Sequence, residues 1–294
     1  MAETTLTPRV SASTRDAQGA FRVFLNRLRG YRPGFISLVL LILLYLVAFA
    51  GPLVMRYSPN ELDLTNMLAG PSIHHLLGTD ENGRDVFARL VYGGRISLVV
   101  GLFAVLIADS VGVILGAVSG YFGRITDQVV MRITDAMLAI PSFLLLLVVL
   151  SLFTPTLTKI ELAIGLTSWM TVARLVRGEF LRHRDADFVL AARSIGASDW
   201  RIMFRHLLPQ AVSPVIVSSS VLVGVAIILE SALSYLGLGV QPPQASWGNM
   251  LTGAQNYVWT EPLLAIYPGV LILITVSAFN YFGEGLRSAL NVTE

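Results

Sequence analysis

The sequence has little charge and no cysteine. Asp, Glu, Lys and Arg make up only 14% of its 294 residues, whereas soluble domains usually carry about 25%. Because 54% of the residues are apolar, so few charged groups cannot cover a protein surface in water, and an ordinary soluble domain is excluded. The lack of cysteine excludes disulfides and thiol chemistry.

Sequence motifs for catalysis are also lacking. There is no phosphate-binding loop of the form G-x-x-x-x-G-K-[ST], and the single lysine, Lys159, has no glycine loop before it. The chain therefore cannot act as an ATPase of that type by itself. Nucleophile motifs such as G-x-S-x-G do not occur either. The adjacent His74 and His75 would point apart on a regular backbone, so we expect no catalytic residue, no bound metal and no cofactor.

What the sequence has instead is a series of long apolar runs. A transmembrane helix needs about 20 apolar residues, and several such runs cannot be hidden inside a soluble core. We therefore predict an all-α, polytopic membrane protein with six transmembrane helices. The predicted spans are residues 35–55, 96–118, 136–153, 162–176, 211–228 and 262–282.

The distribution of basic residues predicts the orientation of these spans. Most of the 21 basic residues fall in the two terminal segments and in the loops after the second and fourth spans, which the positive-inside rule places in the cytoplasm. A cleaved signal peptide is the alternative for the first run, but the polar lead before it is too long. We predict a cytoplasmic tail 1–34, a first transmembrane helix 35–55, an extracytoplasmic segment 56–95, a five-helix core 96–287 with a cytoplasmic loop 185–210, and a tail 288–294.

Two carboxylates fall within or at the end of a predicted span. Asp109 lies midway in the second span, and Glu230 follows the fifth. A carboxylate in the middle of a bilayer costs about 2.5–3.5 kcal/mol on insertion scales, so each must face a partner or a water-filled cavity. Both are candidate pore-lining residues. The alternative is a polar contact between helices, which is favoured slightly for Glu230. A row of glycines, Gly112-x-x-x-Gly116-x-x-x-Gly120, predicts that one face of the second span packs against protein.

The loop 185–210 predicts two short helices on the inner face of the membrane. Gly196 separates an alanine-containing apolar stretch from a second stretch that Ser198 can cap, and we expect Gly196 to have positive φ. Apolar residues in the second stretch (Trp200, Met203, Phe204, Leu207) recur with the period of one helical face. A loop resting on lipid is the alternative to a surface that docks a partner. The expected contact residues are Ala191, Ala192, Gly196, Ser198, Trp200, Phe204, Leu208 and Pro209.

These residues resemble a known motif. Ala191-Ala192, Gly196 and Leu208-Pro209 are similar to the E-A-A-x-x-x-G…L-P loop of ABC-transporter permease subunits, with Leu190 in place of the glutamate. The stretch HLLGTDENGRDVFAR at 75–89 resembles the sequence after the first span in C-type permeases of the dipeptide, oligopeptide and nickel family. Further agreement lies in GYFG at 120–123, SYLGLG at 234–239 and GEGLR at 283–287.

The resemblance implies the MetI-like fold of an ABC importer permease in the cytoplasmic membrane of a prokaryote. The implied substrates are di- or oligopeptides, with nickel or another small solute as the alternative. The implied partners are a second, B-type permease, two ATPase subunits that bind ATP and Mg, an extracytoplasmic substrate-binding protein and the lipid bilayer, but no nucleic acid. The residues expected to contact the binding protein are Gly83, Arg84, Asp85, Pro242 and Pro243.

A stand-alone channel or secondary transporter is the alternative class of protein. Secondary transporters usually contain several intramembrane charges and an internal structural repeat. The sequence has only the two carboxylates noted above and no convincing repeat, so the permease interpretation is favoured.

Overall fold

The structure is a computed structural model that describes residues 26–154 and 156–290. This part of the chain is helical and contains no β-strand, only an isolated bridge between Thr79 and Asp85, which confirms the predicted all-α class. Residues 1–25 and 291–294 of the predicted tails lie outside the described residues. Parts of both predicted tails belong to long helices. One such helix begins at Arg32, and another extends to Leu290.

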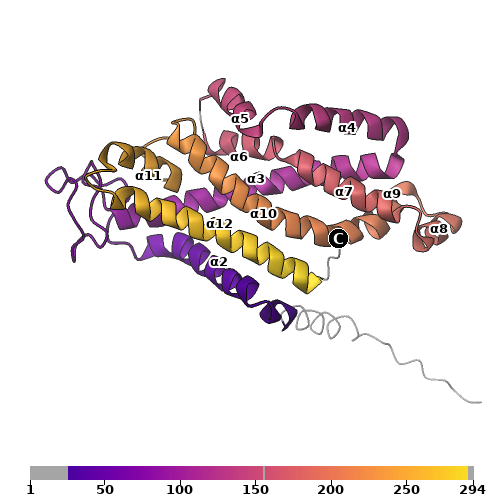
Figure 1. Cartoon of the computed structure of the whole chain (residues 1–294), viewed down its shortest axis with the longest axis horizontal. Coiled ribbons are helices and arrows are strands. Elements are labelled where there is room, and N and C mark those ends of the chain that lie inside the picture. The colour runs from indigo at the N-terminus through magenta and orange to yellow at the C-terminus, as the bar shows by residue number, and fades with distance from the viewer. Residues whose placement is uncertain (1–25, 155, 291–294) are drawn as a thin grey trace, which may run out of the picture.

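Four helical segments are long and apolar enough to cross a membrane. They run roughly parallel or antiparallel along the long axis of the molecule (Figure 1). Each overlaps one of the predicted spans, although the ends differ: the predicted span 35–55, for example, continues past the end of α2. The four long helices are α2 (Arg32–Ala50), α3 (Val86–Phe122), α10 (Leu208–Tyr235) and α12 (Leu263–Leu290).

The predicted span 136–153 is not one straight helix. The structure has α4 (Arg124–Leu138) and α5 (Ser142–Ser151), which are bent by 84° at the break between them. Pro141 occupies the N-cap position of α5. Proline has no N–H to donate and disfavours helical backbone in the residue before it, which explains the interruption at this point.

The predicted span 162–176 is also divided. It falls on α6 (Leu157–Leu166) and α7 (Trp169–His183), with 10 and 15 residues. The Thr167 hydroxyl donates to the carbonyl oxygens of Ala163 and Ile164 at 2.8 and 3.1 Å, at the end of α6. The six-span prediction is therefore not confirmed: the described residues contain four helices that could span, or five if α4 and α5 form one bent span.

Helix α3 lies at the centre of the packing and contacts α2, α6, α7 and α10. The predicted glycine row forms its contact with α7. A Cβ at Gly112 would lie 2.6 Å from Val172 Cβ, and one at Gly116 would lie 2.5 Å from the Ala173 carbonyl oxygen. Only glycine permits this close approach, so the prediction that this face packs against protein is confirmed.

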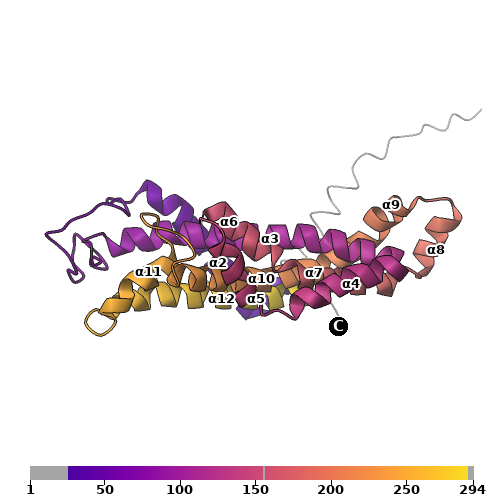
Figure 2. The same ribbon diagram turned by 90° about the horizontal axis from the view of Figure 1, so that it is seen from above.

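The connecting segments gather at two opposite ends of the bundle (Figures 1 and 2). Residues 51–85 and the short helix α11 (Trp247–Ala254) lie at one end, called here the α11 end. Helices α8 (Asp187–Ser194) and α9 (Asp199–Arg201) lie at the other, called the α8 end. The first described residues of the chain and the last turn of α12 lie on the same side as the α8 end.

Candidate functional site

The segment 185–210 forms the α8 end of the molecule. Helix α8 is followed by a turn in which Gly196 has a φ of 81°. This value confirms the positive φ expected for Gly196. Glycine adopts this left-handed conformation without the clash that a Cβ would cause. Residues 195–198, with Gly196 among them, connect α8 to α9.

The second helix of this segment differs from the prediction. It does not end before the membrane span: α9, a π-helical segment (Ile202–Leu207) and α10 follow one another directly and form a single helix from Asp199 to Tyr235. The π-helical hydrogen bonding comes immediately before Pro209, which lies in the first turn of α10 and has no N–H to donate. Ser198 does occupy the N-cap position, but its side chain makes no capping hydrogen bond.

The apolar face predicted for this second helix is divided between the interior and the surface. Met203 and Leu207 are buried and pack with Val189 of α8. Trp200 and Phe204 are 63% and 50% exposed, and their rings stack with centroids 5.3 Å apart. The wider π-helical turn explains why residues spaced for one α-helical face diverge here.

The α8 end therefore presents an exposed apolar surface, called here the α8 surface. Of the predicted contact residues, Ala192 is buried, whereas Ala191 and Gly196 are exposed. Several large apolar side chains are exposed on α8 and on the first turns of the helix that begins at Asp199. The α8 surface consists of Phe188, Leu190, Ile195, Trp200 and Phe204.

A hydrogen bond that the sequence analysis missed fixes this segment to the central helix. The Tyr121 hydroxyl, at the end of α3, donates to Asp199 Oδ1 at 2.6 Å. The two residues are 78 positions apart, one in the GYFG stretch and the other in the loop 185–210, and no sequence pattern indicated that these two segments meet. The bond joins the start of the α9–α10 helix to α3.

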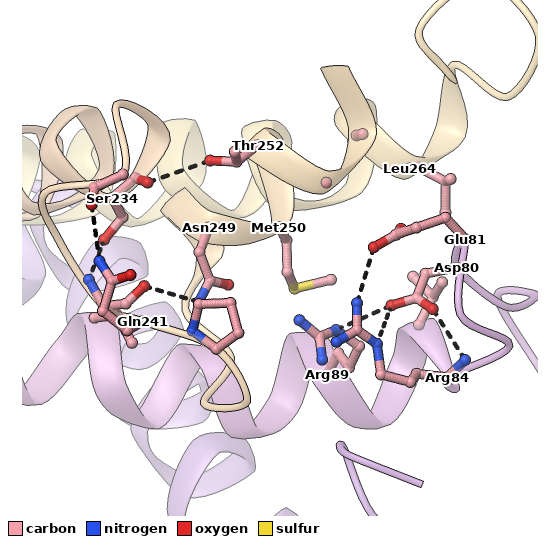
Figure 3. A pocket seen from close by; sticks show the side chains of 16 residues that line it. Asp80, Glu81, Arg84, Arg89, Ser234, Gln241, Asn249, Met250, Thr252 and Leu264 are labelled. Carbon is pink, nitrogen blue, oxygen red and sulfur yellow. Dashed lines mark hydrogen bonds and ion pairs between the residues drawn. The ribbon is translucent and has the colours of Figure 1, made fainter. Parts of the chain in front are cut away.

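At the α11 end, a compact turn precedes α3. The Asp80 carboxylate accepts a hydrogen bond from Arg84 Nε at 2.7 Å and lies 3.3 Å from Arg89 Nε (Figure 3). Gly83 has φ of 72°, and a Cβ there would overlap the carbonyl oxygen of Asp63. Asp85 caps α3 by accepting from Ala88 N at 2.7 Å. The last ten residues of the predicted extracytoplasmic segment 56–95 are helical and belong to α3.

This turn faces the loop between α10 and α11 across a cavity of about 230 Å³. Arg84 and Pro242, both predicted contacts for a binding protein, line the same cavity. Pro242 and Pro243 are exposed, whereas Gly83 and Asp85 are buried and shape the turn from within. Charged and polar side chains from both segments surround the space (Figure 3). They include Asp80, Glu81, Arg84, Arg89, Gln241, Asn249 and Thr252.

The two carboxylates predicted to lie within or at the end of a span are found at the contact between α3 and α10. Glu230 is fully buried and accepts hydrogen bonds from Ser234 at 2.7 Å and from Ser97 of α3 at 3.0 Å. Asp109 Oδ2 accepts from Ser219 of α10 at 2.6 Å. Glu230 therefore does not line an open surface of this chain, and the interhelical alternative describes it better. Asp109 makes the same kind of contact, although its Oδ1 has no partner among the described residues.

The hydrogen bonds around Glu230 extend to the α11 loop. Ser234 Oγ also accepts from Val240 N at 3.0 Å, and Ser97 Oγ accepts from Trp247 N at 3.3 Å. The Trp247 indole N–H donates to the Leu90 carbonyl oxygen at 3.0 Å. These bonds hold the loop that contains Pro242 and Pro243 in a fixed position against α3 and α10.

The fold is that of a polytopic helical membrane protein, with an exposed apolar surface at the α8 end and a cavity lined by charged and polar residues at the α11 end. Residues 112–291 match the sequence pattern of the family described as binding-protein-dependent transport system inner membrane component. Residues 19–71 match the N-terminal TM domain of oligopeptide transport permease C. The chain belongs to this family of binding-protein-dependent permeases, and it is a transport subunit and not an enzyme.

Curated relatives cover nearly the whole chain. A dipeptide transport system permease protein of Alkalihalophilus pseudofirmus is 38% identical over 94% of this chain and 90% of its own length. A glutathione transport system permease protein of Pectobacterium atrosepticum is 41% identical over 85% and 83%. An oligopeptide transport system permease protein of Bacillus subtilis is 37% identical over 90% and 87%. These similarities confirm the resemblance inferred from the sequence motifs.

Proposed function

We propose that this chain is the C-type permease subunit of an ATP-driven peptide importer. A second, B-type permease completes the pore in the cytoplasmic membrane, two ATPase subunits bind the α8 surface from the cytoplasm, and an extracytoplasmic binding protein delivers the substrate to the α11 end. Both termini are cytoplasmic. The ATPases bind ATP and Mg, and this chain supplies neither nucleotide nor metal ligands.

The observation that carries this proposal is the α8 surface. Five large apolar side chains are exposed on a segment that leads directly into α10 and is hydrogen-bonded to α3. Burial of such a surface by an ATPase would be favourable by about 25 cal/mol for each Å² removed from water. Because the α9–α10 helix is continuous, a displacement of the α8 surface moves a membrane helix with it. This arrangement suits the transmission of ATP-driven movement to the pore.

The α11 end has the properties expected of a docking surface for a soluble protein. It is polar and charged around the cavity, and the exposed Pro242 and Pro243 border the same space as Arg84. The loop is held by the Ser234 and Trp247 hydrogen bonds, so little conformational freedom would be lost on binding. A preorganised polar surface favours reversible contact with a binding protein.

The choice of peptides as substrate rests on the relatives. Those described above are named as dipeptide, glutathione and oligopeptide permeases. Glutathione is itself a small peptide, so these names agree on substrates that contain peptide or amide backbone and charged ends. Nickel remains the alternative to be tested.

The test is uptake by the assembled complex. The four kinds of subunit are reconstituted in lipid vesicles, and ATP-dependent uptake of radiolabelled dialanine and trialanine is measured with and without the binding protein. Binding-protein-dependent uptake of either peptide is the expected result. Uptake of nickel chloride with no uptake of peptide would refute the peptide assignment, and uptake without ATPases would refute the importer mechanism.

A matched pair of variants tests the α8 surface in the same complex. Trp200→Ala removes an exposed ring from the α8 surface, and Trp259→Ala removes a ring that is 94% exposed in the loop after α11. We expect Trp200→Ala to lower the amount of ATPase that copurifies with the permease at least threefold, and Trp259→Ala to leave it unchanged. Equal copurification for both variants would contradict the proposed contact.

A further inference from the structure

A groove runs between α7 and α10, separate from the α8 surface and from the cavity at the α11 end. It has a volume of about 660 Å³. One wall is a stripe on α7 and the other is a stripe on α10, and Arg287 of α12 also borders the groove. The α7 stripe contains Thr171, Leu175, Glu179 and Arg182, and the α10 stripe contains Pro214, Val217, Ser218, Val221, Leu222 and Val225. Each stripe extends over 12 residues (171–182 and 214–225) of an antiparallel pair of helices, and the 11 steps along each helix correspond to about 16 Å.

The groove contains hydroxyl groups that the protein itself does not use. Neither Thr171 nor Ser218 makes a side-chain hydrogen bond among the described residues. The adjacent Ser219 donates to Asp109 and the Val215 carbonyl oxygen, and Ser220 donates to the Val217 carbonyl oxygen. Three consecutive serines thus face different surroundings, and the one in the groove is available to a ligand.

Charged side chains lie toward the α8 end of the same groove. Glu179 and Arg182 come from the last turns of α7, and Glu179 Oε2 lies 3.5 Å from His183 Nε2. A second groove, between α2, α3 and α12, is lined instead by apolar residues such as Leu44, Val270 and Leu271, and suits lipid chains. The α7–α10 groove also has apolar lining residues, but its hydroxyl and charged groups would be costly to expose to lipid, so it fits an aqueous path better than a lipid contact.

We propose that the α7–α10 groove is the wall of the substrate path contributed by this chain, and that it binds the peptide backbone in extended form. The Thr171 and Ser218 hydroxyls would bond to backbone amides, and Glu179 or Arg182 would face the oppositely charged peptide terminus that lies near the α8 end. An extended chain advances about 3.3 Å per residue, so a groove of about 16 Å accommodates about five residues. This inference rests on the proposed function as a peptide importer.

The connection of the groove walls to the α8 surface supports this assignment. Helix α7 leads into α8, and α9 leads without interruption into α10. The two walls are therefore the helices on either side of the segment that contains the α8 surface. A movement of that segment by the ATPases would change the distance between the walls, and hence the width of the groove. The earlier pore candidates, Asp109 and Glu230, lie instead at the contact between α3 and α10.

The absence of native cysteine allows a direct test. Thr171→Cys and Ser218→Cys are made singly in the full complex in vesicles, and the rate of modification by N-ethylmaleimide is measured with ATP and with empty or trialanine-loaded binding protein. We expect loaded binding protein to slow modification at both positions at least threefold. Ser110→Cys, on an exposed position of α3 where the hydroxyl bonds its own helix, is the control and should be unaffected.

Two other results would overturn the inference. If both cysteines react in the isolated chain but are protected in the full complex whether or not peptide is present, the groove is a contact with the second permease. If they react at the same rate in every condition, the groove does not meet the substrate. Uptake of trialanine by the unmodified complex, measured in the same vesicles, shows separately whether the proposed function itself holds.

A second pair of variants tests the Thr171 hydroxyl group while the shape of the side chain is kept. Thr171→Val should lower trialanine uptake about fivefold, which corresponds to one lost hydrogen bond, while stimulation of ATP hydrolysis by loaded binding protein is kept. Thr134→Val is the matched control, because the Thr134 hydroxyl donates to the Val130 carbonyl oxygen of its own helix. Unchanged uptake in Thr171→Val would contradict a role for this hydroxyl.

Discussion

Two glycines with positive φ determine the shapes of the two contact regions, and they do so for different reasons. A Cβ added to Gly196, in the turn before α9, would have no heavy atom within 4 Å. One added to Gly83, before α3, would overlap the backbone of Asp63. Gly83 is thus required both by its backbone conformation and by its neighbours, whereas Gly196 is required by its conformation alone. At Gly196 the effect of φ can therefore be tested without a steric clash.

Substitution of Gly196 tests whether coupling depends on this turn. A β-branched residue with positive φ costs about 1–3 kcal/mol, whereas Asn adopts this conformation more readily. We expect Gly196→Val to assemble at the wild-type level but to lose at least 90% of the ATP hydrolysis that loaded binding protein stimulates. Gly196→Asn should keep most of it. The measurement is ATP hydrolysis in vesicles with and without the binding protein, and equal activity of the two variants would show that the turn is not involved.

At the scale of helices, the apolar runs predicted where helices would be found but not where they would bend. The run 136–153 contains Pro141, yet apolar residues continue on both sides of it. Hydropathy alone does not show that the helix axis changes direction at this point. The predicted second span starts directly after the exposed Arg95, whereas α3 begins ten residues before residue 96, at Val86. Arg89 lies within this first part of the helix and is buried beside Asp80.

The helix contact between α3 and α7 offers a test of glycine packing. Gly116→Ala would place a methyl group 2.5 Å from the Ala173 carbonyl oxygen, and overpacking of this kind costs about 1–3 kcal/mol. Gly178→Ala, on an open position of α7, meets nothing within 4 Å and should be neutral or slightly stabilising. We expect a lower thermal unfolding temperature of the purified chain for Gly116→Ala only. Similar unfolding temperatures for both variants would mean that α3 and α7 can move apart to accommodate the methyl group without loss of stability.

The contact regions were partly predictable from sequence. Motifs identified Gly196, Arg84 and Pro242 separately, and their spacing along the chain placed them in loops. That Arg84 and Pro242 line one cavity depends on how α3 packs against the α10–α11 loop, which no local pattern encodes. The exposure of Trp200 beside the buried Met203 depends on the π-helical segment. The predicted apolar face presumed the regular period of an α-helix instead.

At the scale of the whole molecule, continuous helices connect the two contact regions. Helix α3 has 37 residues, which corresponds to about 55 Å, and runs from the turn at Asp85 to the Tyr121 hydrogen bond with Asp199. The helix from Asp199 to Tyr235 has the same number of residues and runs in the opposite direction. Its contacts with α3 include the Glu230–Ser97 and Asp109–Ser219 hydrogen bonds. A movement at either end can therefore be transmitted to the other through rigid elements.

The orientation of these two ends in the membrane gives the last prediction. The segments at the α8 end contain most of the basic residues, so the positive-inside rule places that end in the cytoplasm. Three side chains that are 86–94% exposed provide matched positions: Ile73 and Trp259 toward the α11 end, and Ile195 at the α8 end. Each is replaced by cysteine in the cysteine-free chain, and right-side-out vesicles are treated with a membrane-impermeant maleimide. We expect Ile73→Cys and Trp259→Cys to react at once, and Ile195→Cys to react only after detergent is added. The reverse pattern would invert the orientation, and a difference between Ile73→Cys and Trp259→Cys would require an odd number of spans between them.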